Sequence, residues 1–259
     1  MFGLFKKYKV GDGFLESNSS SLKELPKDAF NNRDIVELDL SSSGLQSLSE
    51  DVSCFKKLES INLEETAILS LPDSIGSLKW LKDLNVSSTN LESLPDSICQ
   101  LSKLNSLDVS NTNLERLPDN IGQLNKLTTL DISETDIESL PASMSGLADL
   151  RELYICGTYL ESIDFDLSKL KKLSFLNLDK SKVTSLPESI GGLQNLEILE
   201  LKDMSELKEL PACLAKLKKL RTINIMFTDD VHVPDEILNN KNIKILSSET
   251  LENSLKGND

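Results

Sequence analysis

Few side chains in this sequence have types and spacings that could carry out catalysis. His232 is the only histidine, and so the only side chain whose charge ordinarily changes between pH 5 and 8. Cys156 could act as a nucleophile, but no histidine is expected beside it to serve as its base. Glu64 and Glu65 are adjacent carboxylates, which a solvated acidic surface explains more simply than an acid–base pair. The sequence therefore predicts a protein that is not an enzyme.

The elements that position these side chains follow from an internal repeat. Pairs of aliphatic residues in the pattern L-x-L recur at a constant step of 23 residues, from Leu38–Leu40 to Leu199–Leu201. The next copy, Ile223–Ile225, follows after 24 residues, and weaker copies lie at Leu15 and Leu246. A fixed period of this length is typical of a solenoid, and it predicts about eleven repeats.

The prolines support the same frame independently. All eight occupy one slot of the repeat, and Asp or Glu often follows them. Because proline fixes φ near −65° and lacks an N–H, this slot predicts the first residue of a short helical turn. Each L-x-L segment predicts a short strand whose leucines point inward, and stacking about eleven such strands at roughly 4.8 Å gives a parallel sheet about 50 Å long.

The full frame, L-x-x-L-x-L-x-x-T-x-L-x-x-L-P-x-x-I-x-x-L, appears intact from Leu81 to Leu101. It resembles the leucine-rich repeat family. With threonine where many of these repeats carry asparagine, it is similar to intracellular repeats of plant Ras-group and resistance proteins and to leucine-rich domains of bacterial effectors. The resemblance implies an α/β solenoid: a horseshoe with a parallel concave sheet and short helical turns on the convex side.

Both ends of such a stack need caps, because an exposed leucine face promotes aggregation. We predict an N-terminal cap at residues 1–13, a solenoid at 14–248 and a C-terminal cap or tail at 249–259. Phe2, Leu4 and Phe5, followed by lysines, leave open a second interpretation of the N-terminus as a membrane-surface element.

Composition and cysteine spacing restrict the partners and the compartment. The 28 Lys and Arg residues against 42 Asp and Glu give a net charge of −14, which disfavours a nucleic acid or an anionic membrane as the partner. No apolar run is long enough to span a bilayer. The four cysteines lie in non-adjacent repeats without a C-x-x-C pair, so we expect free thiols, a cytoplasmic location, a monomer, and neither metal nor cofactor.

The register names the side chains on the concave face. In the early repeats they are small, polar and acidic, and Glu64, Asp108 and Asp131 would steer a partner with a basic patch. From the sixth regular strand onward they become aromatic, aliphatic and basic. We predict partner contacts in this later group, although a contact with the protein's own C-terminal tail is an alternative. The predicted contacts are Tyr154, Tyr159, Phe175, Lys180, Ile198, Lys202, Met226 and Phe227.

The predicted function is a non-enzymatic scaffold that binds a partner protein on its concave face. A bacterial effector delivered into a host cell is the main alternative, and a ubiquitin ligase that uses Cys156 is an enzymatic one. The 24-residue step predicts one structural irregularity, a bulge between Lys202 and Glu206. It should interrupt the column of hydroxyl side chains, because Met204 or Ser205 stands where other repeats have threonine.

Overall fold

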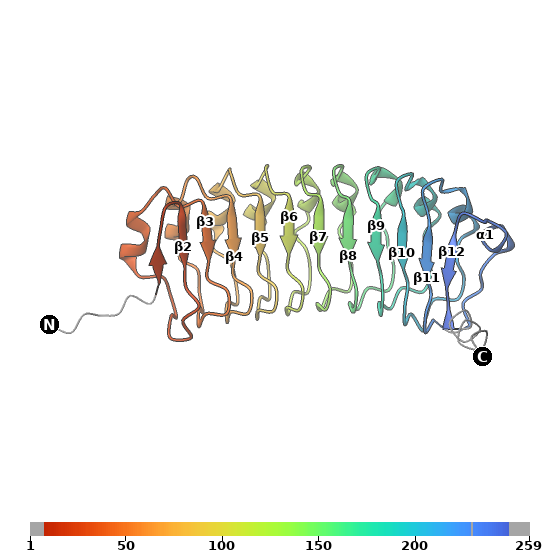
Figure 1. The fold of residues 1–259 in the computed structure, drawn as a ribbon, viewed down its shortest axis with the longest axis horizontal. Helices are drawn as coiled ribbons and strands as arrows, with labels where there is room; N and C mark the ends of the chain where they lie inside the picture. The colour runs from red at the N-terminus through yellow and green to blue at the C-terminus, as the bar shows by residue number, and fades with distance from the viewer. Residues whose placement is uncertain (1–7, 229, 249–259) are drawn as a thin grey trace, which may run out of the picture.

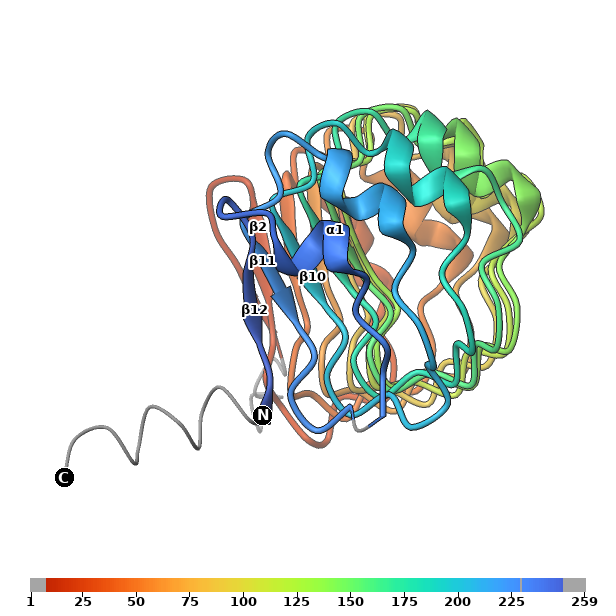
Figure 2. The ribbon, with the colours of Figure 1, turned by 90° about the vertical axis from the view of Figure 1, so that its right-hand side faces the viewer.

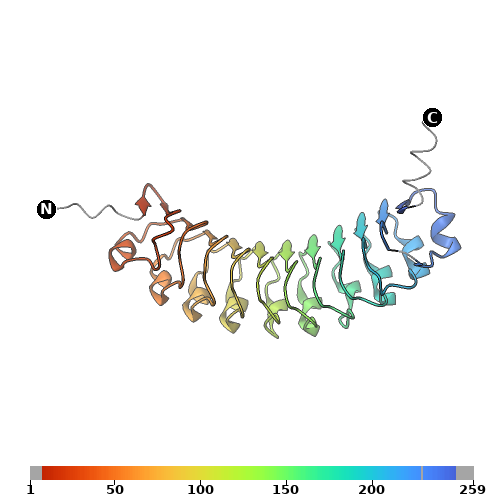
Figure 3. The same ribbon diagram turned by 90° about the horizontal axis from the view of Figure 1, so that it is seen from below.

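The computed structural model describes residues 8–228 and 230–248, which form a curved solenoid (Figures 1 and 3). Its described strands, β1 to β12, join one sheet in the order in which they occur along the chain. Strands β2 to β12 pair in parallel, which confirms the eleven predicted repeats. Viewed from its end, the sheet lies on one side and the helical turns on the other (Figure 2).

The strands are short, as the L-x-L pattern predicts. They are β1 (Lys9–Val10), β2 (Phe14–Glu16), β3 (Glu37–Asp39), β4 (Ser60–Asn62), β5 (Asp83–Asn85), β6 (Ser106–Asp108), β7 (Thr129–Asp131), β8 (Glu152–Tyr154), β9 (Phe175–Asn177), β10 (Ile198–Glu200), β11 (Thr222–Asn224) and β12 (Lys244–Leu246). The 23-residue period sets their register directly. Leu84, for example, pairs with Leu107, and Ile198 pairs with Phe175.

The convex side consists of single helical turns, most of them 3-10 helices. They are η1 (Lys27–Asn31), η2 (Glu50–Cys54), η3 (Asp73–Ser77), η4 (Asp96–Gln100), η5 (Ile121–Gln123), η6 (Ala142–Gly146), η7 (Leu167–Lys169), η8 (Glu188–Gly192), η9 (Ala212–Lys216) and the α-helical turn α1 (Asp235–Leu238). The predicted position of proline is wrong by one residue. Pro72, with φ −71° and ψ 150°, precedes η3 as its N-cap, because its carbonyl must accept the first bond of the turn, from Ile75 N–H at 3.0 Å.

Leucine and isoleucine side chains from the strands and turns fill one continuous core. Leu84, Leu107 and Leu130, which follow one another on β5 to β7, are at most 1% exposed. The same core takes in Ile75 and Leu78, three and six residues after Pro72. A single repeat could not bury these side chains alone, so stacking supplies most of the stability.

A column of buried threonines closes the turn after each of the five successive strands β4 to β8. The hydroxyls of Thr66, Thr89, Thr112, Thr135 and Thr158 each donate to the carbonyl three residues earlier, at 2.7–3.0 Å. These carbonyls belong to the last inward-pointing residue of the strand segment, where water has no access. The hydroxyl thus satisfies a buried acceptor, which explains why a threonine can stand in this column.

The 24-residue step interrupts that column, as predicted. Met204 is fully buried at the threonine position, and Asp203 keeps the positive φ (58°) that Glu65 has at the equivalent place. The extra residue therefore lies between Met204 and Leu207. The Thr228 hydroxyl, from the next repeat, donates to the Leu201 carbonyl at 2.5 Å and accepts from Met204 N–H at 3.1 Å. One side chain thus supplies the hydroxyl that the preceding repeat lacks.

Replacing Thr228 with valine is expected to lower the free energy of unfolding by about 1–3 kcal/mol, because two buried backbone groups lose their partner. Thr112→Val is the matched control, since the Thr112 hydroxyl donates to a single carbonyl, that of Val109. Urea unfolding and amide hydrogen exchange measure the difference. An equal or smaller cost at Thr228 would contradict this account of the interrupted column.

At the N-terminal end, β1 and β2 pair as an antiparallel hairpin. Tyr8, the residue before β1, is buried as part of the same core. Residues 1–7 of the predicted N-terminal cap, with the possible membrane-surface element, and all of the segment 249–259 lie outside the described residues. Within the described ranges, no helix has the length and apolar character that a bilayer crossing needs.

Candidate functional site

The polar column on the early concave face has a structural task. In this column an Asp or Asn side chain ends seven of the nine strands from β3 to β11, and its oxygen accepts the N–H of the residue two positions later. Asp108 Oδ1 accepts from Ser110 N–H at 2.9 Å, and Asp131 Oδ1 accepts from Ser133 N–H at the same distance. Asp39, Asn62, Asn85, Asn177 and Asn224 do the same. Asp108 and Asp131 therefore close their own turns, while their charge still faces the concave side.

Strand β8 breaks this column, because Tyr154 replaces the Asp or Asn. Its ring lies 5.0 Å from the ring of Phe175, centroid to centroid, and its hydroxyl donates to Glu152 Oε2 at 3.2 Å. Phe175 in turn pairs in register with Ile198 on β10. Tyr154, Phe175 and Ile198 form what we call the apolar strip, and all three side chains are half-buried on the concave face.

The other predicted contacts lie beside the strip, toward the carboxyl ends of the strands. Tyr159 is 47% exposed, with Lys182 Nζ 4.6 Å from its ring centroid. Phe227 is 60% exposed and has a φ of 60°, which is unfavourable for a bulky side chain. Met226 is half-buried, and Lys180 is exposed with a positive φ. The structure thus brings Tyr154, Phe175 and Ile198 together in the apolar strip. Four of the other predicted contacts lie along the edge beside it: Tyr159, Lys180, Met226 and Phe227.

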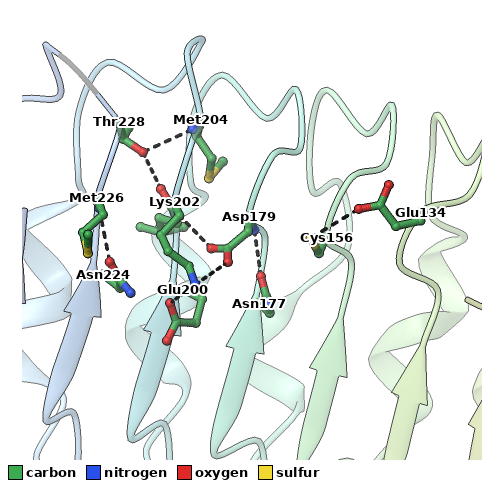
Figure 4. Close-up of polar contacts among 11 residues, drawn as sticks. Glu134, Cys156, Asn177, Asp179, Glu200, Lys202, Met204, Asn224, Met226 and Thr228 are labelled. Carbon is green, nitrogen blue, oxygen red and sulfur yellow. Dashed lines mark hydrogen bonds and ion pairs between the residues drawn. The ribbon is translucent and has the colours of Figure 1, made fainter. Parts of the chain in front are cut away.

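Lys202 belongs to a charged cluster that was not foreseen from the sequence (Figure 4). Its Nζ lies 3.1 Å from Asp179 Oδ2 and 3.6 Å from Glu200 Oε2, and the bond to Asp179 raises the pKa of Lys202. The Asp179 carboxylate, which is almost fully buried, also accepts the Lys202 N–H at 2.7 Å. In most repeats this N–H bonds to the Asp or Asn that ends the same strand. Glu200 ends this strand and does not accept it, so Asp179 of the preceding repeat accepts it instead.

One signal in the sequence could have identified this cluster. Glu200 stands where the column requires Asp or Asn, and Asp179 stands one repeat earlier where a serine is common. Two neighbouring departures from the repeat therefore compensate each other. As a result, the Lys202 ammonium is fixed between the carboxylates of Asp179 and Glu200, which offset its positive charge at the end of the apolar strip.

Cys156 lies between these groups, on the strand segment that carries Tyr154. Its Sγ is 4.0 Å from Glu134 Oε1 (Figure 4). Burial, together with the charges of Asp179 and Glu134, raises the pKa of the thiol. The thiol is therefore protonated at neutral pH, the opposite of what an activated nucleophile requires. Within the described ranges no group of three or more His, Cys, Asp or Glu residues could hold a metal ion.

We expect the alkylation rate of Cys156 to rise with pH through a midpoint above that of an ordinary cysteine. The measurement is iodoacetamide modification followed by mass spectrometry, in a variant whose other three cysteines are replaced by alanine. Glu134→Gln should lower the midpoint, because it removes one of the charges that disfavour the thiolate. A midpoint below about 8.5, the ordinary cysteine pKa, would contradict the structure and revive a thiol-dependent activity.

Two family models together match residues 103–257 of the chain. One, described as a leucine-rich repeat region, matches residues 160–257, and the other, described as a leucine rich repeat, matches residues 103–160. A comparison with curated proteins finds no significant match.

Solved structures show the same architecture over most of the chain. A leucine-rich repeat protein from Leptospira interrogans is 27% identical, with a TM-score of 0.79 over 86% of this chain and 57% of that one. The leucine-rich repeat domain of the type III effector XopL is 25% identical, with a TM-score of 0.66 over 93% of this chain and 78% of that one. A TDR receptor, at 24% identity, has a TM-score of 0.76 over 86% and 40%.

The fold and its open concave sheet define a repeat solenoid of the kind that serves as a scaffold for protein–protein interaction. The family matches and the structural neighbours place the chain more narrowly: it is a leucine-rich repeat protein. It spans 57% of the length of the Leptospira protein, so what that whole protein does applies to this chain only as a proposal.

Proposed function

We propose that this chain is a non-enzymatic scaffold that captures a partner protein on the concave face over strands β8 to β11. The observation that carries the proposal is the break in the polar column at Tyr154. On strands β3 to β7 the Asp or Asn that ends each strand accepts a backbone N–H of its own turn, and no aromatic or large aliphatic side chain stands on the concave face. From Tyr154 onward, Phe175 and Ile198 present half-exposed apolar surface that no segment of the described chain covers. Aromatic and aliphatic residues in a polar surround are typical anchors of protein interfaces.

The charges around the apolar strip indicate what the partner should carry. Glu64, Asp108 and Asp131 lie on the early strands, and Asp131 is deep enough that burial raises its pKa. Lys180 and the ion-paired Lys202 lie on the other side of the strip. A partner segment with an apolar centre and a basic side toward the early repeats would complement the apolar strip and the early carboxylates, and these carboxylates would raise its association rate at low salt.

The test is capture of partners from the native organism with immobilised wild-type protein, Phe175→Glu and the matched control Ser106→Glu. Ser106 occupies the same column on β6, so both variants add one negative charge to the same face. A protein retained by the wild type and by Ser106→Glu, but lost by Phe175→Glu, supports the proposal. A partner that all three retain equally would place binding elsewhere on the molecule.

The cysteines support a proposal for the compartment in which this binding takes place. All four are free thiols, in agreement with a reducing environment, and we propose the cytoplasm and a monomeric state.

Action inside a host cell, as a delivered effector, is a second candidate for the same binding role. The match to the XopL domain, which covers 93% of this chain, favours it. A translocation reporter fused to the chain, expressed in the native organism next to host cells, tests this candidate. Reporter activity inside the host supports delivery. Its absence, with the fusion expressed and a known effector delivered in parallel, contradicts it.

A further inference from the structure

The charges of the chain are divided between the two long edges of the sheet. We call the four residues before each of strands β3 to β12 the amino-end rim, since parallel stacking places them along one edge (Figure 1). These segments contain 14 of the 28 Lys and Arg residues but only 4 of the 42 Asp and Glu residues. The rim is therefore strongly basic in a chain of net charge −14.

The opposite edge has the opposite sign. Glu92, Glu115, Glu138 and Glu161 occupy one exposed column on it, one in each of four successive repeats. At least seven residues of largely extended chain separate the two edges, or roughly 20 Å. That is more than twice the Debye length of about 8 Å at physiological ionic strength, so the acidic edge hardly weakens the field at the basic one.

Most of the basic side chains in the rim are exposed without a carboxylate partner, although Lys79, Lys219 and Arg221 donate hydrogen bonds to neutral oxygens. All 14 are exposed, and four of them pair with carboxylates: Lys57, Lys82, Lys126 and Lys172. For the other ten, no carboxylate of the described chain lies within 4.0 Å. Inter-repeat pairing thus neutralises only a minor part of the rim.

The amino-end rim also carries the sole tryptophan of the chain. Trp80 is 51% exposed, and Lys103 Nζ lies 3.1 Å from its ring centroid. Val36, two repeats earlier in the rim, is 37% exposed. An exposed tryptophan among lysines is the combination that suits the boundary between lipid headgroups and acyl chains.

The shape of the rim matches a flat ligand. The solenoid bends in the plane perpendicular to its strands (Figure 3), so the amino ends of the strands stay nearly level from one end to the other (Figure 1). We propose that the amino-end rim docks on an anionic membrane surface, with its unpaired lysines and arginines on the headgroups and Trp80 at the interface. This docking is independent of the partner site and leaves the concave face open to the side.

The net charge of the whole chain, which disfavours an anionic partner, does not apply to this rim, because at physiological salt only charges within about a Debye length of the surface contribute. A nucleic acid shares the negative charge but not the flat surface, and the Lys103 ammonium already lies over the ring of Trp80, where a base would have to stack. The membrane is therefore the partner that the charge, the shape and Trp80 together favour.

The test is sedimentation of the full chain with phosphatidylcholine vesicles prepared with and without phosphatidylserine. The rim variant replaces Lys56, Lys171 and Lys218 with glutamate; none of these side chains has an ion pair or side-chain hydrogen bond among the described residues. The control variant replaces Arg116, Lys182 and Lys208 with glutamate. These residues lie toward the acidic edge, and the substitutions change the net charge by the same amount as in the rim variant. Trp80 fluorescence and its quenching by acrylamide report whether the tryptophan enters the interface.

We expect the wild type to bind only vesicles that contain phosphatidylserine and to be released by salt, with Trp80 emission shifted to shorter wavelength and protected from acrylamide. The rim variant should bind about 100-fold more weakly, at roughly fivefold per lysine, and the control variant should bind like the wild type. No binding to phosphatidylserine, an equal loss in both variants, or binding to duplex DNA or RNA without binding to vesicles would each overturn the proposal.

Discussion

Replacing Leu107 with alanine is expected to lower the free energy of unfolding by about 2–5 kcal/mol. Leu107 is fully buried at the centre of β6, in register between Leu84 and Leu130. The neighbouring repeats are held in place by their own strand pairing, so they cannot move in to fill the space. The substitution therefore leaves a cavity at the centre of the continuous core. Denaturant unfolding, followed by circular dichroism, measures the change.

Ser110→Ala, three residues away on the concave face, is the matched control. The Ser110 hydroxyl donates to Asp108 at 2.6 Å but stays half-exposed, so water can replace it after substitution. We expect a change below about 1 kcal/mol. A larger cost at Ser110 than at Leu107 would mean that the two columns had been assigned to the wrong faces, and every concave-face residue named above would change with them.

Replacing Phe175 with glutamate is expected to weaken binding of the partner by more than about 2 kcal/mol, which is roughly 30-fold in Kd. Phe175 is the centre of the apolar strip, between Tyr154 and Ile198, and the change buries a charge where the partner should place an apolar side chain. The measurement is affinity by calorimetry or surface plasmon resonance, against the protein that the capture experiment yields.

Folding of this variant needs its own control, because Phe175 is half-buried and packs on Tyr154. We expect the loss of this ring contact to cost about 1 kcal/mol, well below the cost of a core substitution. Thermal melting of Phe175→Glu beside Ser106→Glu measures it. Unfolding of Phe175→Glu would show that the side chain belongs to the core, and normal affinity would show that the strip is not the interface.

Changing Glu64 and Glu65 to lysine separates steering from anchoring at the same interface. Charges at a distance from the apolar strip act mainly on the association rate and on its salt dependence. This variant should therefore slow association at low salt and leave the dissociation rate nearly unchanged, whereas Phe175→Glu should act on dissociation.

The fold could be predicted from the sequence because the repeat is local and regular. A constant 23-residue period determines which residue of one strand lies beside which residue of the next, so the pairing of Phe175 with Ile198 followed from counting alone. The buried leucines, the threonine column and its interruption at Met204 followed from the same frame. The proline slot was wrong by one residue because the frame shows where a turn begins but not which atom accepts its first hydrogen bond.

Tertiary structure decided which side chains bond across repeats, even where departures from the frame, as at Asp179 and Glu200, mark the place in the sequence. That Thr228 serves the preceding repeat, and that Asp179 supplies the acceptor missing beside Glu200, depends on distances between side chains whose repeat partners are themselves irregular. The charges of the two edges of the sheet could likewise not be read from the net charge of −14, because a net charge does not say where the charged side chains lie. The basic rim exists because parallel stacking gathers the amino ends of strands that are far apart in the sequence, and an electrostatic field depends on where the charges lie.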